Sequence, residues 1–291
     1  MSNQLLTASE IRDLAKSLDL KPTKKLGQNF VIDQNTVEKI VKVAKVDSNS
    51  HVLEIGPGLG SLTLALLQTK AKVNAVEIDE ILAKLLPKTA ESKGFIAEKL
   101  RVVNKDALLL NKSDIADSPN LLVANLPYNV SVPVILHILE NFPSITNYLV
   151  MVQSEVADRL ASKPGSKTYG SPSVKVQWYA SVKKSFAISR NVFWPIPNVD
   201  SELVEIKRDK EIDESIKNEL FKVIDLAFEQ RRKMLRSALS SLCGGSEKAS
   251  KLLQSANIDP QLRGEALTVE DYVRLTYVMK KSGLLTTVKK S

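Results

Sequence analysis

The sequence of 291 residues is poor in residues that form cross-links and metal sites. It contains one cysteine, Cys243, and two histidines, His51 and His137. A single cysteine excludes a disulfide within the chain, which fits a reducing compartment. Three such residues far apart in the sequence do not indicate a zinc site, so we expect no bound metal and interpret all three as structural.

The sequence also lacks segments that direct a chain to a membrane. Residues 1–7 contain no basic stretch followed by an apolar one. No apolar run approaches the ~20 residues that span a bilayer. We therefore expect a soluble, cytoplasmic protein.

Basic residues outnumber acidic ones. The chain has 41 Lys and Arg against 33 Asp and Glu, which gives a net charge of +8. This balance favours a polyanionic partner, with nucleic acid first and an acidic membrane surface second. A merely basic, solvated surface is the alternative. Hydrophobic residues make up 43% of the chain, enough for a sizeable core.

Short apolar runs alternate with segments of helical periodicity as far as residue 153. The alternation predicts a parallel, doubly wound sheet. The expected strands are residues 52–55, 72–77, 100–104, 121–124 and 148–153, and two further strands are expected at 180–188 and 202–207. A helix is expected before the first strand, at residues 33–46, and helices between the strands are expected at 61–68, 80–90 and 132–139.

The pattern changes to helices alone after Asp209. We expect helices at residues 214–228, 232–241, 247–256 and 269–280. Two domains are therefore predicted, an α/β domain of residues 1–209 and a small helical domain of residues 210–291. Residues 163–172 are rich in turn formers and are predicted to form a mobile loop.

A glycine-rich segment, Glu54-Ile-Gly56-Pro-Gly58-Leu-Gly60, joins the first of these strands to its helix. Glycines permit a tight turn and a close approach of ligand to backbone. The dinucleotide fingerprint has the different spacing Gly-x-Gly-x-x-Gly and holds a pyrophosphate. Glu54 favours a ligand that carries a positive charge, such as the ammonium group of an amino acid.

Two acidic residues follow the next strands. Glu77 could accept hydrogen bonds from both hydroxyls of a ribose, in NAD as well as in S-adenosylmethionine, or could be a solvated acid at a strand end. Asp106 could bind the exocyclic amine of an adenine, or could cap a helix.

The segment Asn125-Leu126-Pro127-Tyr128 follows the strand at 121–124. The Asn125 side-chain carbonyl can accept a hydrogen bond from an amine on an aromatic base. Pro127 has no N–H, and backbone carbonyls beside it can accept a second one. Tyr128 offers a face on which a base can stack. A turn that happens to contain these residues is the alternative.

The order of these motifs resembles the class I S-adenosylmethionine-dependent methyltransferases, and within them the small-subunit (16S) rRNA adenine dimethyltransferases. The resemblance covers about residues 20–280. It rests on Lys25-Leu-Gly-Gln-Asn-Phe30, the glycine-rich segment, Asn125–Tyr128, Phe193-Trp-Pro-Ile-Pro-Asn-Val-Asp-Ser201, and Phe228-Glu-Gln-Arg-Arg-Lys233 followed by Leu235-Arg-Ser-Ala-Leu239.

The resemblance implies a Rossmann-like methyltransferase sheet, a helical RNA-recognition domain and S-adenosylmethionine as cofactor. It implies a cofactor site of Asn29, Val31, Gly56, Glu77, Asp106 and Asn125, to which the glycine-rich segment adds Glu54 and Gly58. The implied catalytic residues are Asn125, Leu126, Pro127, Tyr128 and Phe193, with Tyr128 and Phe193 holding the target adenine. Val31 stands where the family more often has Leu, and Trp194 occupies a variable place.

The implied activity is dimethylation of the N6 amines of two adjacent adenines near the 3′ end of 16S rRNA in the immature small subunit, by a monomer. Charge suggests RNA contacts through Lys24, Lys25, Arg231, Arg232, Lys233 and Arg236. A solvated, salt-bridged helix face is the alternative for the cluster at 231–236.

Three other functions stay open at this point. The first is methylation of large-subunit rRNA adenines by an enzyme with similar motifs. The second is a ribosome-assembly factor that keeps the fold without catalysis. The third is an NAD-dependent oxidoreductase, which the glycine spacing disfavours.

Overall fold

The computed structural model describes residues 4–18, 29–115 and 117–285. Two compact units arise by packing. Unit 1 is formed within residues 1–157 and 182–208, and unit 2 within residues 158–181 and 209–291. Residues 158–181 group with the C-terminal helices because the Trp178 and Tyr179 rings lie 5.5 and 6.1 Å from the Phe221 ring. The predicted domains, divided at residue 209, differ from these units by that segment.

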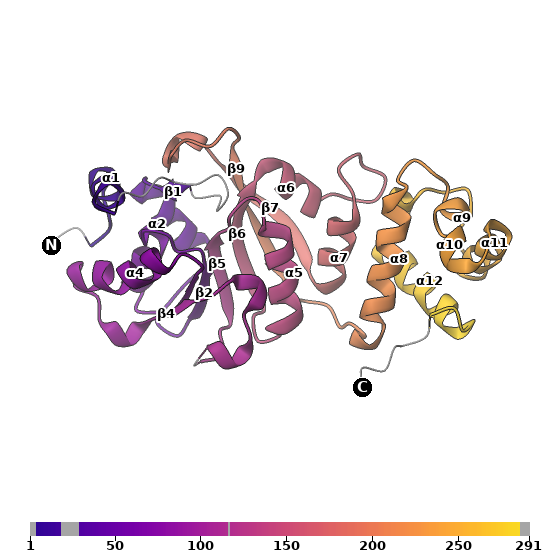
Figure 1. The fold of residues 1–291 in the computed structure, drawn as a ribbon, viewed down its shortest axis with the longest axis horizontal. Coiled ribbons are helices and arrows are strands. Elements are labelled where there is room, and N and C mark those ends of the chain that lie inside the picture. Colours follow the sequence, from indigo (N-terminus) through magenta and orange to yellow (C-terminus); the bar gives the residue numbers. More distant parts are fainter. Residues whose placement is uncertain (1–3, 19–28, 116, 286–291) are drawn as a thin grey trace. The chain divides into compact units, whose positions relative to one another are not determined.

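A seven-stranded sheet with the order β4-β3-β2-β5-β6-β9-β7 forms the centre of unit 1 (Figure 1). The strands are β2 (His51–Ile55), β3 (Lys72–Glu77), β4 (Leu100–Asn104), β5 (Leu121–Asn125), β6 (Asn147–Gln153), β7 (Ser181–Ile188) and β9 (Ser201–Lys207). Strands β2 to β6 pair in parallel, and β9 pairs antiparallel with β6. The mostly parallel sheet predicted from the sequence is confirmed.

The order of the strands reverses between β2 and β5. In open α/β sheets ligands bind outside the carboxyl ends of the strands at such a reversal. The sequence motifs at Glu54, Glu77 and Asn125 all stand at or beside these ends. The topology therefore brings together residues that are far apart in the chain.

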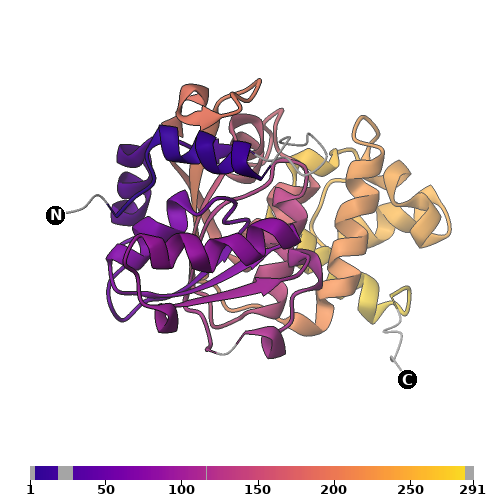
Figure 2. The ribbon, with the colours of Figure 1, turned by 60° about the vertical axis from the view of Figure 1, so that its left-hand side comes forward.

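Helices α1 to α4 cover one face of the sheet and gather on its indigo and purple side (Figures 1 and 2). Their bounds are α1 (Ala8–Ser17), α2 (Gln34–Val43), α3 (Ser61–Gln68) and α4 (Glu80–Ser92). Thr7 and Glu10 form a capping box at α1, and Asp33 caps α2 by accepting from the Thr36 N–H. Helix α5 (Ser131–Asn141) lies across the sheet in Figure 1, and α6 (Ser154–Leu160) follows β6.

A small two-stranded sheet joins two of the sequence motifs. Strand β1 (Phe30–Val31) pairs antiparallel with β8 (Phe193–Trp194), so that Val31 lies opposite Phe193. The rings of Phe30 and Trp194 stack with centroids 6.4 Å apart. This pairing fixes the segment that begins at Asn29 to β8, within unit 1.

Unit 2 consists of helices. They are α7 (Ser171–Tyr179), α8 (Lys217–Glu229), α9 (Leu235–Ala238), α10 (Ser240–Cys243), α11 (Ser246–Ser255) and α12 (Val269–Lys281). The orange α8 and the yellow α12 lie side by side in both views (Figures 1 and 2). Within the described ranges, no helix of either unit is long and apolar enough to cross a bilayer.

The predicted helix at residues 232–241 was wrong in its first part. Residues 231–233 form a turn, and α9 begins only at Leu235. The Leu235 and Arg236 N–H groups donate to the carbonyls of Leu262 and Pro260. The segment 259–262 therefore supplies the hydrogen-bond acceptors for the first N–H groups of this helix. Arg232 and Arg236 therefore do not share one helix face.

Candidate functional site

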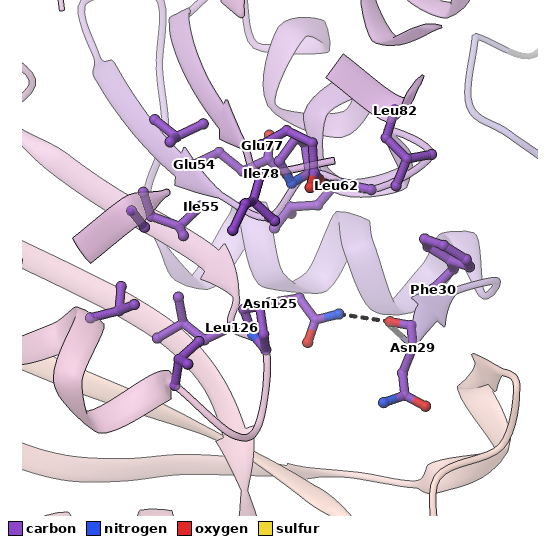
Figure 3. Close-up of a pocket in the computed structure, with 18 of the residues that line it drawn as sticks. Asn29, Phe30, Glu54, Ile55, Leu62, Glu77, Ile78, Leu82, Asn125 and Leu126 are labelled. Carbon is purple, nitrogen blue, oxygen red and sulfur yellow. Dashed lines mark hydrogen bonds between the residues drawn. The ribbon is translucent and has the colours of Figure 1, made fainter. Parts of the chain in front are cut away.

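A cavity of about 250 Å³ opens at the carboxyl ends of β2, β3 and β5 in unit 1 (Figure 3). All but one of the predicted cofactor and catalytic residues line it. Those that do are Asn29, Val31, Glu54, Gly56, Gly58, Glu77, Asp106, Asn125, Leu126, Pro127 and Tyr128.

The glycine-rich segment forms the turn after β2 and lines the cavity. Gly58 has φ +58°, and a Cβ there would stand 2.9 Å from the Phe30 ring. Gly56 has φ +68°, and its N–H donates to the Val76 carbonyl over 2.9 Å. A larger residue at Gly58 would push Phe30 away, so glycine is required for the close packing of β1 over this loop.

Glu54 ends almost fully buried, with 1% of its surface exposed. The Thr63 hydroxyl in α3 donates to its Oε2 over 2.7 Å. Burial raises the pKa of Glu54 to about 8, against the weaker opposing effect of the Thr63 hydrogen bond. A positively charged group in the cavity would stabilise the ionised form of this carboxyl.

Glu77 is held by the backbone instead. Its Oε2 accepts from the Gly58 N–H over 3.1 Å and its Oε1 from the Asp79 N–H over 3.0 Å. Burial nevertheless raises the pKa of Glu77, since the residue is only 5% exposed. Each carboxylate oxygen has two lone pairs, so Glu77 can accept further hydrogen bonds in a fixed orientation.

Asp106 is a helix cap that also lines the cavity, and its contact with an adenine stays a prediction. Its Oδ1 accepts from the Leu108 N–H over 2.9 Å and so caps the short helix η2 (Ala107–Leu109). It also lines the cavity, on the same side as Ala107 and Leu108. The cap fixes the carboxyl without using all of its acceptor sites.

Asn125 points into the cavity from the end of β5. Its Nδ2 donates to the Asn29 carbonyl over 3.0 Å, as the dashed line in Figure 3 shows. The assignment of Nδ2 and Oδ1 follows from this bond. Among the described residues no donor contacts Oδ1, so the side chain presents an acceptor to the cavity.

The backbone beside Asn125 offers one more acceptor. The Pro127 carbonyl accepts from the Val130 N–H over 3.2 Å, and the Leu126 N–H donates to the Met151 carbonyl. Within the described part of the chain, the Leu126 carbonyl accepts no such bond. Of the carbonyls of Leu126 and Pro127, that of Leu126 is therefore the better candidate for the second acceptor.

Tyr128 is positioned by a residue that the sequence analysis did not single out. Its hydroxyl forms a 2.6 Å hydrogen bond with the Oγ of Ser201, which is fully buried. Burial raises the pKa of Tyr128, so the hydroxyl stays protonated at neutral pH. Ser201 ends the motif that starts at Phe193, and that motif was the available signal for this contact.

Phe193 is the predicted residue that does not line the cavity. Its ring is 1% exposed, and its strand pairs with Val31. Phe193 belongs to the hydrophobic core that also contains Phe30 and Val31 of β1. Its contact with a target base stays a prediction.

The predicted RNA-binding cations differ in how far they are engaged within the chain. Lys24 and Lys25 lie outside the described residues. Arg232 and Lys233 are exposed in the turn before α9, and Arg236 is half-buried. Arg231 instead donates from Nε to Glu265 over 2.7 Å and from Nη2 to the Lys167 carbonyl over 2.6 Å.

Comparison with known proteins covers nearly the whole chain. The profile of the family described as "Ribosomal RNA adenine dimethylase" matches residues 20–281. A protein of Corynebacterium glutamicum named "Ribosomal RNA small subunit methyltransferase A" is 54% identical over 282 residues, covering 96% of each chain. Its counterpart from Corynebacterium efficiens is 56% identical over 280 residues, covering 95% of this chain and 97% of that one.

Solved structures show the same fold at lower identity. A dimethyladenosine transferase from Plasmodium falciparum superposes with a TM-score of 0.72 at 24% identity, over 86% of this chain and 97% of that one. The 23S rRNA methyltransferase ErmE superposes with a TM-score of 0.64 at 23% identity, over 86% and 99%. These two likenesses establish the fold alone.

Proposed function

We propose that this chain, which belongs to the ribosomal RNA adenine dimethylase family, dimethylates the N6 amines of two adjacent adenines near the 3′ end of 16S rRNA. Family membership makes it an S-adenosylmethionine-dependent rRNA adenine methyltransferase. The observation that carries the choice of the small subunit is the 54–56% identity to relatives named for that subunit.

The cavity has the polar groups that S-adenosylmethionine requires. We assign the ammonium group to the buried Glu54, the ribose hydroxyls to Glu77 and the adenine amine to Asp106. The buried Ser61 hydroxyl also lines the cavity and has no hydrogen-bond partner among the described residues. Such a buried, unpaired hydroxyl is expected where a bound molecule supplies the partner.

The reaction requires alignment and activation of a weak nucleophile. When bound, S-adenosylmethionine supplies a methyl group on a positively charged sulfur, which is a strong electrophile. The lone pair of adenine N6 is delocalised into the ring, so the protein has to make it available. Asn125 Oδ1 and the Leu126 carbonyl can accept the two N6 hydrogens and favour a tetrahedral nitrogen.

The same two acceptors stabilise the positive charge that develops on N6 during attack. No strong base is required, because the methylated ammonium is acidic and loses a proton to water. The cavity wall from Asn125 to Tyr128 accordingly contains no His, Asp or Glu. For the second transfer the amine has one hydrogen fewer, so one of the two hydrogen bonds is given up.

The other proposed properties follow from the same relatives. We propose that the substrate is 16S rRNA within the immature small subunit, that the enzyme acts as a monomer, and that it works in the cytoplasm. The support is the name of the relatives, which specifies the small subunit, and the basic net charge of the chain. Light scattering on the purified protein gives its molar mass in solution and so tests whether it is a monomer.

The decisive experiment compares substrates. The purified chain is incubated with S-adenosylmethionine and either immature small subunits or large-subunit RNA, and the rRNA is digested and analysed by mass spectrometry. We expect dimethyladenosine in the small-subunit RNA alone. Methylation of large-subunit RNA alone would refute the proposal, and binding of small subunits without any methyl transfer would favour an assembly factor.

A further inference from the structure

Arg231 contacts two segments that are distant from it in the sequence. Its Nε donates to the Glu265 carboxylate over 2.7 Å, and its Nη2 donates to the Lys167 backbone carbonyl over 2.6 Å. The Gly165 N–H donates to the backbone carbonyl of Glu265 over 2.7 Å. Arg231 and Glu265 thus form a bracket around residues 163–168, all within unit 2.

The bracketed segment, which we name the lysine loop (residues 163–168), presents positive charge. Lys163 and Lys167 are exposed, whereas the next residue, Tyr169, is buried with its ring 6.2 Å from the Phe228 ring. The loop predicted to be mobile is therefore tied to the helices by the bracket and by Tyr169. Neither lysine side chain forms an ion pair within the described residues.

We propose that the lysine loop is an RNA-binding surface and that Arg231 is a positioning residue that holds it, while Lys163 and Lys167 contact the phosphates. The inference rests on the proposed function, because it takes RNA as the partner. One N–H on Nε and one on Nη2 of Arg231 are already engaged, so the Nε–Nη2 edge of its guanidinium is not open to a phosphate. Its neighbours Arg232 and Lys233 are exposed and can bind RNA directly.

The two possible roles of Arg231 predict opposite effects for its partner. If Arg231 contacted phosphate directly, Glu265→Gln would remove a nearby negative charge and tighten RNA binding. If the bracket holds the lysine loop, the same substitution weakens the hold and loosens RNA binding. Glu229 is exposed at the end of α8, so Glu229→Gln is the matched control that measures loss of one acidic charge alone.

The first experiment follows the loop without RNA. Hydrogen exchange of the Gly165 amide, which donates to Glu265, reports whether the bracket is closed. We expect faster exchange in Arg231→Met and no change in Arg232→Met, which removes the same charge one residue later. Equal exchange in both variants would overturn the positioning role.

The second experiment measures binding to immature small subunits over a range of salt. We expect Glu265→Gln to weaken binding roughly 3- to 5-fold and Glu229→Gln to strengthen it slightly. Lys167→Gln should weaken binding in the wild-type background and have little effect in Arg231→Met, because residues that act through one another are not additive. Tighter binding by Glu265→Gln, or additive effects of Lys167 and Arg231, would overturn the inference.

Two controls separate the possible failures. Wild-type methylation of the same particles is measured first, so that loss of the proposed function is seen independently of the variants. Titration with S-adenosylhomocysteine reports on the cavity in unit 1 and should be unchanged in every variant. If Arg231→Met does not fold, Glu265→Gln and Lys167→Gln still decide the question.

Discussion

The cavity of unit 1 and the basic surface of unit 2, by which we mean Arg231, Arg232, Lys233 and the lysine loop, are built in different ways. In the cavity, Glu54, Glu77 and Asn125 stand at the ends of β2, β3 and β5, which are neighbours in one sheet. The backbone ladder places these side chains. On the basic surface, Arg231 lies in a turn and is placed by bonds to Glu265 and Lys167, over 34 and 64 residues of sequence.

This difference governs how each region should respond to substitution. A cavity residue can be changed while its strand keeps its position, so the loss is local and affects one step of the reaction. A residue of the basic surface holds other residues, so a change there spreads to the lysine loop but each effect is modest. The following substitutions test this contrast, from the largest expected effect to the smallest.

Asn125→Ala should show the largest effect. It removes the Oδ1 acceptor for the target amine while the Leu126 carbonyl remains. We expect turnover to fall on the order of 10²- to 10³-fold, as for loss of one positioned hydrogen-bonding group at a reacting atom. Affinity for S-adenosylhomocysteine, measured by calorimetry, should stay within several-fold.

Asn49→Ala is the matched control for this variant. Asn49 is exposed in the turn before β2, and its backbone N–H, not its side chain, makes the bond to Asp47. Its activity should equal that of the wild type. Full activity in Asn125→Ala would contradict the mechanism. It would also contradict the expectation that changing one residue at a strand end abolishes one step of the reaction.

Sequence patterns predicted the strand ends well because the sheet obeys local rules. Strands 72–77 and 100–104 and the helix 61–68 are found with the predicted bounds. Strand β3 is a mostly apolar run that ends at Glu77 and is buried over its last five residues, as an inner strand of a parallel sheet requires. Strand β4 lies at the edge of the sheet, and its residues are partly or fully exposed. The strand ends thus follow from local pattern, whereas the grouping of Glu77 and Asn125 in one site was implied by the family resemblance.

Helix α7 was not predicted, and its environment explains why. Val174, Val176, Trp178 and Tyr179 are all buried, and they point in different directions around the helix. A helix that is covered on several sides lacks the apolar stripe by which helices are recognised in a sequence. The turn formers before Ser171 then made the whole region resemble a loop.

The contacts that position the predicted residues could not be predicted either. Thr63 holds Glu54, Ser201 holds Tyr128 and Glu265 holds Arg231. Each partner is a common residue type in an ordinary place, and only the tertiary fold brings it within 3 Å. The sequence thus predicted which groups line the cavity, but not the side chains that orient them.

Glu54→Gln should have the second-largest effect, on cofactor binding. Gln keeps the shape of the side chain but cannot ionise. At pH 8 we expect affinity for S-adenosylhomocysteine to fall about 10-fold or more, since hydrogen bonds to charged groups contribute roughly 1.5–3 kcal/mol. In the wild type, affinity should increase from pH 6 to 8 because an ammonium group requires ionised Glu54. The variant should lack this increase.

The same carboxyl predicts how the free protein's stability depends on pH. Glu54 has a pKa of about 8 in the folded chain against an ordinary value of 4.5. Between these values the folded chain keeps a proton that the unfolded chain has released. The contribution of Glu54 to the unfolding free energy is therefore complete below pH 4.5 and is lost as the pH rises toward 8. Chemical denaturation of the wild type and Glu54→Gln at pH 5 and 8 isolates this loss.

Thr63→Val sharpens the test of Glu54. It removes the hydroxyl that donates to Glu54, so burial acts unopposed and the pKa of Glu54 should rise further. The pH at which cofactor affinity increases should move upward, whereas Thr63→Ser should restore the wild-type value. An unchanged pH profile in Thr63→Val would show that this hydrogen bond does not tune the cavity.

Tyr128→Phe should have a smaller effect than Asn125→Ala or Glu54→Gln. The ring that we expect to stack on the adenine remains, and only the bond to Ser201 is lost. We expect turnover to fall several-fold, by about 1 kcal/mol for one hydrogen bond. Tyr128→Ala, which removes the stacking face, should cost more. Equal losses in both variants would mean that the hydroxyl, not the ring, is the important part.

Arg232→Gln should have the smallest effect of the series. Arg232 is exposed in the turn before α9, and no ion pair is found for it within the described residues. Loss of one phosphate contact should lower the slope of log affinity against log salt concentration by about one and leave cofactor binding unchanged. A drop in cofactor affinity or a loss of activity as large as that of Asn125→Ala would break the contrast between the two regions. An unchanged slope would instead assign Arg232 to a solvated surface, and would leave Lys233 and the lysine loop as the phosphate contacts of unit 2.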